Sequence, residues 1–146
     1  MFLGRYEHNI DEKGRITIPS KFREELGETV AVTQGFDGNL QAYPPDLFDL
    51  LAERIRGLSL MDPNSRKLRR IFFSNAEKID FDKAGRILLP AFLRASANLS
   101  DTAVLVGSGE YFELWSPENW QIQQTSLSDV EANEQRFSSL DLTTLP

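Results

Sequence analysis

Residues 11–19 have the sequence DEKGRITIP, and residues 82–90 have the sequence DKAGRILLP. Aspartate, glycine, arginine, isoleucine and proline recur in both stretches at the same spacing, 71 positions apart. Internal repeats indicate a fold assembled from related units that bury their apolar faces against one another. The duplication therefore decides the architecture that we expect.

The similarity continues beyond these nine residues, for about forty residues in each copy. The matched pairs include Asp11 with Asp82, Arg15 with Arg86, Ile16 with Ile87, Ile18 with Leu89, Phe22 with Leu93 and Arg23 with Arg94. One inserted residue near Asn98 then aligns residues 30–35 with 102–107, and Pro45 with Pro117. A whole structural unit has been duplicated.

Each copy predicts the same order of elements: an extended segment, a glycine turn, a short strand, a short helix and a hairpin. The expected extended segments are 5–10 and 75–81, the short helices 20–26 and 91–97, and the hairpin strands 29–34 with 40–43 and 102–106 with 111–115. Four short strands cannot close a core alone. We therefore expect a mainly β fold with short helices, in which two interleaved repeats form one small barrel about a pseudo-two-fold axis.

The segments around the repeats predict helices. Residues 44–58 place Leu47, Leu50, Leu51, Ile55 and Leu58 along one apolar stripe, and residues 62–73 begin with an Asp-Pro helix start. The expected organisation is a first repeat at 1–60, a basic connecting helix at 61–74, a second repeat at 75–124, and an acidic, polar C-terminal segment at 125–146 with a weak helix and a loose tail.

Composition limits the function. The net charge is −6, yet residues 64–94 carry 8 basic and 3 acidic side chains, whereas residues 95–146 carry 1 and 8. A locally basic surface is thus compatible with an acidic chain. The chain has no cysteine, which removes disulfides and cysteine zinc sites, and no apolar run long enough to span a membrane. We expect a cytoplasmic protein.

The two glycine turns are the candidate binding site. Lys13 and Arg15, and Lys83 and Arg86, are expected to project from the hairpin tips, where arginine can engage phosphates or guanine edges. Gly14 and Gly85 are expected as turn residues, and Asp11 and Asp82 as scaffold that accepts turn N–H groups or orients the arginines. Spacing alone also allows ordinary exposed charges or Asp–Arg pairs within the chain. Arg23 and Arg94 recur as well and could clamp a carboxylate.

The sequences DEKGRITIPSKFR and DKAGRILLPAFLR, with FLGRYEHNI at the start of the chain, closely resemble the MraZ family of bacterial transcriptional regulators, whose halves are related to AbrB-type DNA-binding domains. The resemblance implies a double-split or swapped-hairpin, AbrB-like barrel that assembles into a ring. It also implies binding to short G-rich direct repeats in the promoter of the cell-division and cell-wall gene cluster. Arg15 and Arg86 would contact this DNA, with Lys13 and Lys83 beside them.

The two copies differ at the tips. Lys13 is replaced by Ala84, Glu12 by Lys83, and Lys21 by Phe92, so the second tip keeps a lysine one place earlier. The expected partners are double-stranded promoter DNA and further copies of the chain, with a nucleoid location. No membrane and no small-molecule substrate is expected. The basic run 66–70 is interpreted as a subunit interface that meets acids such as Glu24, Glu25 or Asp49 of a neighbour.

Two other functional classes compete with DNA binding. An enzyme would need a catalytic or metal-binding cluster, but His8 is the only histidine, and no phosphate-binding loop, nucleophile elbow or dinucleotide motif is present. The sequence therefore predicts no enzyme activity, no cofactor and no metal. The alternative function is an AbrB-like assembly or antitoxin-type protein-binding module without specific DNA recognition.

Overall fold

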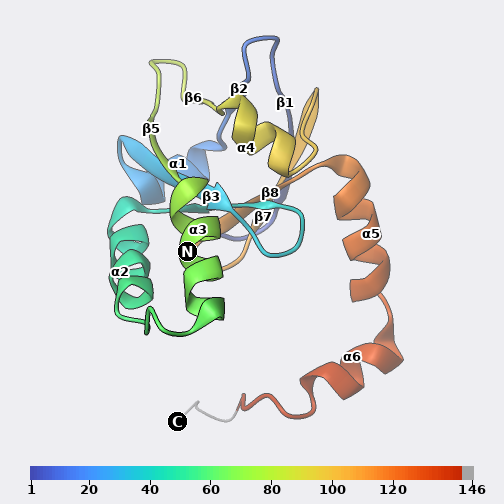
Figure 1. Cartoon of the computed structure of the whole chain (residues 1–146). Helices are drawn as coiled ribbons and strands as arrows, with labels where there is room; N and C mark the ends of the chain where they lie inside the picture. The colour runs from blue at the N-terminus through green and yellow to red at the C-terminus, as the bar shows by residue number, and fades with distance from the viewer. Residues whose placement is uncertain (143–146) are drawn as a thin grey trace.

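The computed structural model describes residues 1–142 (Figure 1). Its strands are β1 (Arg5–Asn9), β2 (Arg15–Thr17), β3 (Thr29–Gln34), β4 (Leu40–Tyr43), β5 (Glu77–Asp80), β6 (Arg86–Leu88), β7 (Thr102–Gly107) and β8 (Phe112–Trp115). Its helices are α1 (Ser20–Leu26), α2 (Pro45–Arg56), α3 (Pro63–Ser74), α4 (Ala91–Ser96), α5 (Pro117–Leu127) and α6 (Val130–Phe137). Both repeats form the expected elements in the expected order.

The two repeats exchange their first strands. The main sheet has the order β1-β7-β8-β4-β3-β5. β1 of the first repeat therefore pairs with β7 of the second, while β5 of the second repeat pairs with β3 of the first, both antiparallel. The centre of this order is the β4–β8 pair, about which the two halves are related. The predicted interleaving is confirmed.

The second strand of each repeat forms a separate two-stranded ribbon, β2–β6. Arg15 lies opposite Leu88, Ile16 opposite Ile87, and Thr17 opposite Arg86. Side chains alternate between the faces of a strand. Ile16 and Ile87 accordingly point into the core and are almost fully buried, whereas the residues on either side of them face outward.

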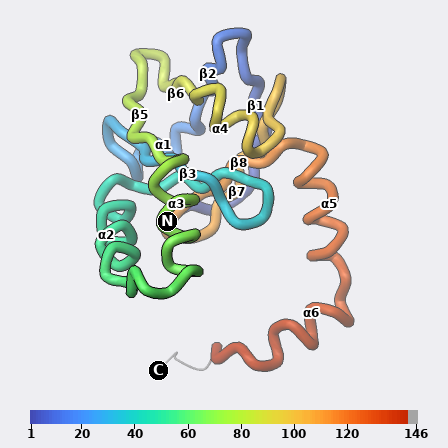
Figure 2. The backbone as a smooth tube through the Cα atoms, in the orientation of Figure 1, coloured from blue at the N-terminus to red at the C-terminus, as the bar shows by residue number. Residues whose placement is uncertain are grey.

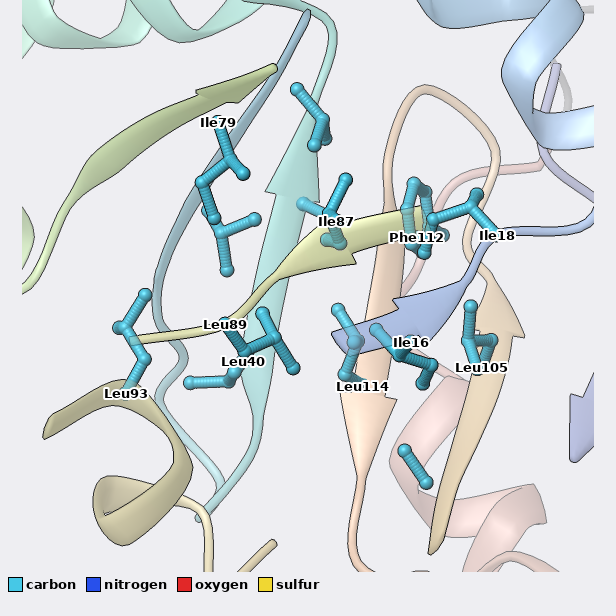
Figure 3. Packing of buried hydrophobic residues seen from close by; sticks show 14 of the residues in the cluster. Ile16, Ile18, Leu40, Ile79, Ile87, Leu89, Leu93, Leu105, Phe112 and Leu114 are labelled. Carbon is cyan, nitrogen blue, oxygen red and sulfur yellow. The ribbon is translucent and has the colours of Figure 1, made fainter. Parts of the chain in front are cut away.

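The main core lies between this ribbon and the six-stranded sheet. Figure 3 shows ribbon residues such as Ile16, Ile18, Ile87 and Leu89 packed with residues of the sheet such as Leu40, Leu105, Phe112 and Leu114. Phe22 of α1 and Leu93 of α4 complete the cluster, and both are buried. Neither repeat could enclose this core alone, because one ribbon strand and one exchanged strand come from the other repeat.

A second cluster forms where α2 and α3 cover β3 and β4. Its centre is a stacked pair, Phe48 and Phe72, with ring centroids 4.9 Å apart. The predicted apolar stripe on the 44–58 segment is wrong in part, because Leu50 is 46% exposed and Leu58 is 42% exposed. Phe48 takes the buried position, since α3 offers Phe72 on that side of α2.

Strands build the core and helices surround it, so the predicted mainly β class with short helices is confirmed. The strand ladders of residues 1–142 form two sheets. The isolated bridge between Ile10 and Ile16 links the two sheets. Among the helices of the described residues, none is long and apolar enough to cross a membrane.

The C-terminal segment starts on the body and then leaves it. The ring centroids of Trp120 in α5 and Trp115 lie 5.6 Å apart, and Arg5 Cζ lies 5.9 Å from the ring centroid of Trp120. Beyond this anchor, α5 and α6 extend away from the sheets (Figures 1 and 2). The predicted weak helix corresponds to α6, which buries no residue. The last part of the predicted tail, 143–146, lies outside the described residues.

An arginine of each repeat covers the glycine turn of the other. Arg23 Nε donates to the carbonyl oxygen of Ile18, and a Cβ added to Gly85 would lie 2.6 Å from Arg23 Cζ. In the second repeat, Arg94 Nε donates to Leu89 O, and a Cβ on Gly14 would lie 2.9 Å from Arg94 Nε. The expectation that these arginines clamp a carboxylate is wrong, because their partners are backbone carbonyls.

This packing predicts a specific cost for a side chain in the turn. Gly85→Ala places a Cβ at φ +77° and displaces Arg23 from its carbonyl partner. Gly109→Ala is the matched control, because Gly109 has φ +85° and no atom within 4 Å of an added Cβ. In both variants the free energy of unfolding should fall by about 1–2 kcal/mol, because alanine is strained at a positive φ angle. Gly85→Ala should lose about 1 kcal/mol more for the hydrogen bond, measured by urea denaturation.

The same comparison in an Arg23→Ala background isolates the arginine contact. There the difference between the two glycine variants should disappear, since the displaced side chain is absent. A difference that persists without Arg23 would show that the arginine does not constrain the turn.

Candidate nucleic-acid interface

The two glycine turns project from the same end of the molecule (Figures 1 and 2). They are held together by the β2–β6 ribbon, whose ladder continues into both turns. Ile18 N donates to Gly85 O at 3.1 Å, and Leu89 N donates to Gly14 O at 2.9 Å. The turn of each repeat is therefore hydrogen-bonded to the other repeat, and the structure brings the two predicted tips together.

Within the first tip, Asp11 organises both the turn and its arginine. Asp11 Oδ1 accepts from the backbone N–H groups of Lys13 at 3.0 Å and Arg15 at 2.9 Å. Its Oδ2 accepts from Arg15 Nε at 2.6 Å. One carboxylate thus sets the turn backbone and the direction of the guanidinium. The guanidinium is bound at Nε, and its Nη1 and Nη2 groups form no hydrogen bond with any described residue.

The second tip has the same arrangement. Asp82 Oδ1 accepts from the N–H groups of Ala84 and Arg86, each at 2.9 Å, and Oδ2 accepts from Arg86 Nε at 2.8 Å. Both glycines take positive φ angles, +90° at Gly14 and +77° at Gly85. A left-handed position of this kind favours glycine, because a Cβ would be strained there. The duplicated motif is therefore a duplicated hydrogen-bonding unit.

The hydrogen bonds change the acidity of these aspartates. The pKa of Asp11 lies below its ordinary value of 3.8, chiefly because the backbone N–H of Arg15 donates to the carboxylate, with the Arg15 side chain adding to the effect. The pKa of Asp82 is lowered in the same way by Arg86. Both carboxylates therefore remain charged, and the arginines remain bound, at neutral pH.

The ribbon places both arginines on one face. Arg15 and Arg86 occupy outward positions of paired strands, and their side chains are 35% and 34% exposed. They are diagonal neighbours, a relation that puts residues about 7–8 Å apart. Lys13 and Lys83 lie in the exposed turns. Neither lysine forms an ion pair with any other described residue.

The face is asymmetric. Thr17 of the first repeat corresponds to Leu88 of the second, and Lys21 corresponds to Phe92. Leu88 is 53% exposed and Phe92 is 46% exposed, although both are large apolar residues. The repeat alignment contained this signal, but exposure could only be known once β6 and α4 were placed. The two ends of the ribbon therefore present different chemistry.

Other candidate residues lie elsewhere. The basic run 66–70 belongs to α3, which packs on β3 away from the tips (Figure 1). No group of three or more His, Cys, Asp or Glu side chains in residues 1–142 could hold a metal ion. The basic α3 surface and the tips are thus separate features of the molecule.

The lowered pKa values predict an acid-dependent loss of stability. A carboxylate whose pKa is lower in the folded chain stabilises the fold fully above its unfolded pKa and progressively less as the pH falls through the folded pKa. The free energy of unfolding should therefore fall as the pH is lowered through the ordinary aspartate pKa of 3.8 and below it. The Asp11→Asn, Asp82→Asn double variant should show a shallower fall in a denaturation series across these pH values.

Glu12→Gln is the control, because Glu12 lies in the same turn and its carboxylate makes no hydrogen bond to another described residue. It should leave the pH dependence close to that of the unmodified chain. Equal slopes for the unmodified chain and the double asparagine variant would contradict the role assigned to the two aspartates.

Comparison with known proteins gives the family. The family model described as "MraZ protein, putative antitoxin-like" matches twice, over residues 1–71 and 72–140. A protein of Herpetosiphon aurantiacus named "Transcriptional regulator MraZ" is 46% identical over 129 residues, covering 88% of this chain and 90% of that protein. The protein of the same name from Thermomicrobium roseum is 48% identical over 128 residues, with the same coverage.

A third relative of that name, from Roseiflexus castenholzii, is 44% identical over 138 residues and covers 94% of each chain. Among solved structures, that of PHS018 from Pyrococcus horikoshii gives a TM-score of 0.32 at 13% identity, covering 80% of this chain and 97% of that one. The relatives named as transcriptional regulators span almost the whole chain, and the family model matches each half. The chain belongs to the MraZ family.

Proposed function

We propose that the chain is a sequence-specific DNA-binding transcriptional regulator. It acts in the cytoplasm on nucleoid DNA, where it binds short G-rich direct repeats in the promoter of the bacterial cell-division and cell-wall gene cluster. Membership of a family whose relatives are named transcriptional regulators supports a regulatory and non-enzymatic role. The observation that carries the DNA contact is the pair of arginines on one face of the ribbon.

The arginines suit guanine for geometric reasons. A guanidinium donates two parallel hydrogen bonds to O6 and N7 of guanine in the major groove, and a two-stranded ribbon fits that groove. Asp11 and Asp82 bind Nε of their arginines, so Nη1 and Nη2, which have no hydrogen bond to a described residue, could make this contact. A diagonal spacing of about 7–8 Å corresponds to roughly two base-pair steps. One ribbon would thus contact guanines within a short site.

The lysines and the apolar residues have different tasks. Lys13 and Lys83, at the exposed tips, would neutralise phosphates on either side of the groove. Thr17 and Leu88 occupy equivalent outward positions of the ribbon, but only Leu88 is a large apolar residue. The two ends of the ribbon would therefore meet different bases, which favours a directional site over a palindromic one.

Assembly explains how an acidic chain binds DNA. The net charge is −6, so the attraction of one subunit for DNA is limited to its basic tips. In a homo-oligomeric ring, several subunits would engage successive repeats, and each bound subunit would raise the effective concentration of the next. Weak single contacts would then add up to strong binding of repeated sites.

The antitoxin-type alternative is supported by the words "antitoxin-like" in the description of the family model. A protein-binding module of that kind would not need two oriented arginines on one face. Specific DNA binding that depends on these arginines separates the two functions.

Removing the arginines should weaken specific binding. On DNA with a single G-rich site, Arg15→Ala and Arg86→Ala should each reduce the binding free energy by about 1–3 kcal/mol, because each removes a bidentate contact. The double variant should lose more. Fluorescence anisotropy of G-rich against scrambled DNA measures this difference. Arg54→Ala is the control, because Arg54 is an exposed residue of α2 outside the ribbon, and this variant should bind DNA almost as the unmodified chain does.

Binding of the double variant that equals that of the unmodified chain would remove the ribbon from the mechanism. An unmodified chain that fails to distinguish G-rich from scrambled DNA would favour the antitoxin-type alternative.

The lysines should control the salt dependence instead. Lys13→Ala and Lys83→Ala should weaken binding to all sequences alike, because phosphate contacts carry no base preference. Each should reduce the slope of log K against log salt by about 1, in a titration series over salt concentration. A change in base preference with an unchanged slope would instead place these lysines against the bases.

A further inference from the structure

Helix α6 presents an apolar surface that its own chain leaves open. Val130 is 69% exposed and Phe137 is 49% exposed. They lie seven positions apart and therefore share one side of the helix, with Glu134 between them. Glu131 and Glu134 form no ion pair with any other residue of the described chain. This side of α6 combines exposed apolar groups with unpaired carboxylates.

The joint before α6 holds it away from the body. Arg136 donates to the carbonyl oxygen of Ser126 at 3.1 Å and to Ser126 Oγ at 3.1 Å. Asn133 Nδ2 donates to Leu127 O at 2.7 Å, and Asp129 caps α6 by accepting from Ala132 N at 3.1 Å. These bonds fix the angle between α5 and α6. Folding of α6 back onto its own subunit would have to break them.

A surface of complementary chemistry lies at the α2–α3 corner. We define the corner face as Leu58, Leu60, Met61, Arg66, Lys67 and Arg70. Its three apolar residues are 42%, 60% and 87% exposed. Arg66 Nη1 donates to Leu60 O at 2.8 Å, which places the basic and apolar parts side by side. No basic residue of this face forms a salt bridge within residues 1–142.

Of the three acids expected to meet this face, Glu24, Glu25 and Asp49, the last two are already engaged. Glu25 pairs with the N-terminal amino group of Met1 at 2.9 Å, and Asp49 pairs with Lys78 at 2.8 Å. The carboxylates of α6 are not engaged in this way. They lie in the acidic C-terminal part of the chain, whereas α3 carries basic residues and no acidic ones. Charge complementarity therefore points to α6 as the partner of the corner face.

We propose that α6 of one copy docks on the corner face of a second copy. Val130 and Phe137 cover the three apolar residues of the corner face, while Glu131 and Glu134 pair with Arg66 and Arg70. The contact is head-to-tail, because the two surfaces differ, and contacts of this type generate closed rings or open chains. This inference rests on the proposed self-association and names the surfaces that produce it.

Introduced cysteines provide the test, because the chain has none of its own. One sample of the full chain carries Glu134→Cys and a mass tag, and a second sample carries Arg70→Cys. After the two are mixed, a bis-maleimide linker should join tagged to untagged chains. A mixture of Glu134→Cys with Glu12→Cys is the matched control and should give no such species, because the turn between β1 and β2, which contains Glu12, lies away from α3 (Figure 1).

Charge exchange gives a second measurement on the same surfaces. Glu131→Arg with Glu134→Arg, and separately Arg66→Glu with Arg70→Glu, should each reduce the oligomer mass measured by light scattering. A mixture of the two variants should restore the oligomer mass, because α6 of each variant then meets opposite charges on the corner face of the other variant. Only contacts between copies can be rescued by mixing.

The remaining outcomes overturn the proposal. Linkage only within a chain that carries both Glu134→Cys and Arg70→Cys would show that α6 closes on its own subunit, and absence of any linkage would show that it docks elsewhere. DNA binding to a single G-rich site, measured on the same samples, separates the two proposals. Retained DNA binding without linkage rejects the docking alone, whereas linkage without DNA binding rejects the proposed function alone.

Discussion

The contact of each arginine with the glycine turn of the opposite repeat is the constraint on which the rest of the structure depends. Arg23 reaches across to Gly85 while its Nε is bound to Ile18 O, and Arg94 does the same at Gly14. The arginines lie so close to the turns that a Cβ would be 2.6 Å from Arg23 Cζ at Gly85 and 2.9 Å from Arg94 Nε at Gly14. Since each repeat supplies the cover for the other, neither tip can be built correctly by one repeat. In the main sheet, the exchanged strands β1 and β5 likewise pair with strands of the opposite repeat.

The exchange also explains how a short ribbon can orient functional groups. The Asp–Arg pairs at the tips are partly exposed, and exposed ion pairs contribute little to stability. Their value lies in direction, because Asp11 and Asp82 each bind two backbone N–H groups as well as the arginine Nε. The turn and the guanidinium therefore form one hydrogen-bonded unit. The buried isoleucines of the ribbon, Ile16 and Ile87, hold that unit on the core.

Charged side chains are distributed unevenly over the molecule. Basic tips stand at one end, while the basic α3 and the acidic C-terminal segment stand away from them (Figure 1). Most acidic side chains of this chain, whose net charge is −6, lie outside the tips, which hold only Asp11, Glu12 and Asp82. Pairing Glu131 and Glu134 of α6 with Arg66 and Arg70 of another copy would remove two of the basic charges of α3 from the exposed surface of the assembly.

The sequence by itself determined the two repeats, the order of their elements, and the tip residues, because a duplicated motif and local turn chemistry are written in neighbouring positions. Gly14, Gly85 and their aspartates belong to this class, since their bonds reach only a few residues along the chain. Which groups Arg23 and Arg94 bind, and which side of α2 is buried, was decided only by the tertiary structure. Arg23 lies against a turn 62 positions away, and Phe48 is buried because Phe72 arrives from α3. Local spacing cannot specify such contacts, because they depend on where the other repeat places its backbone.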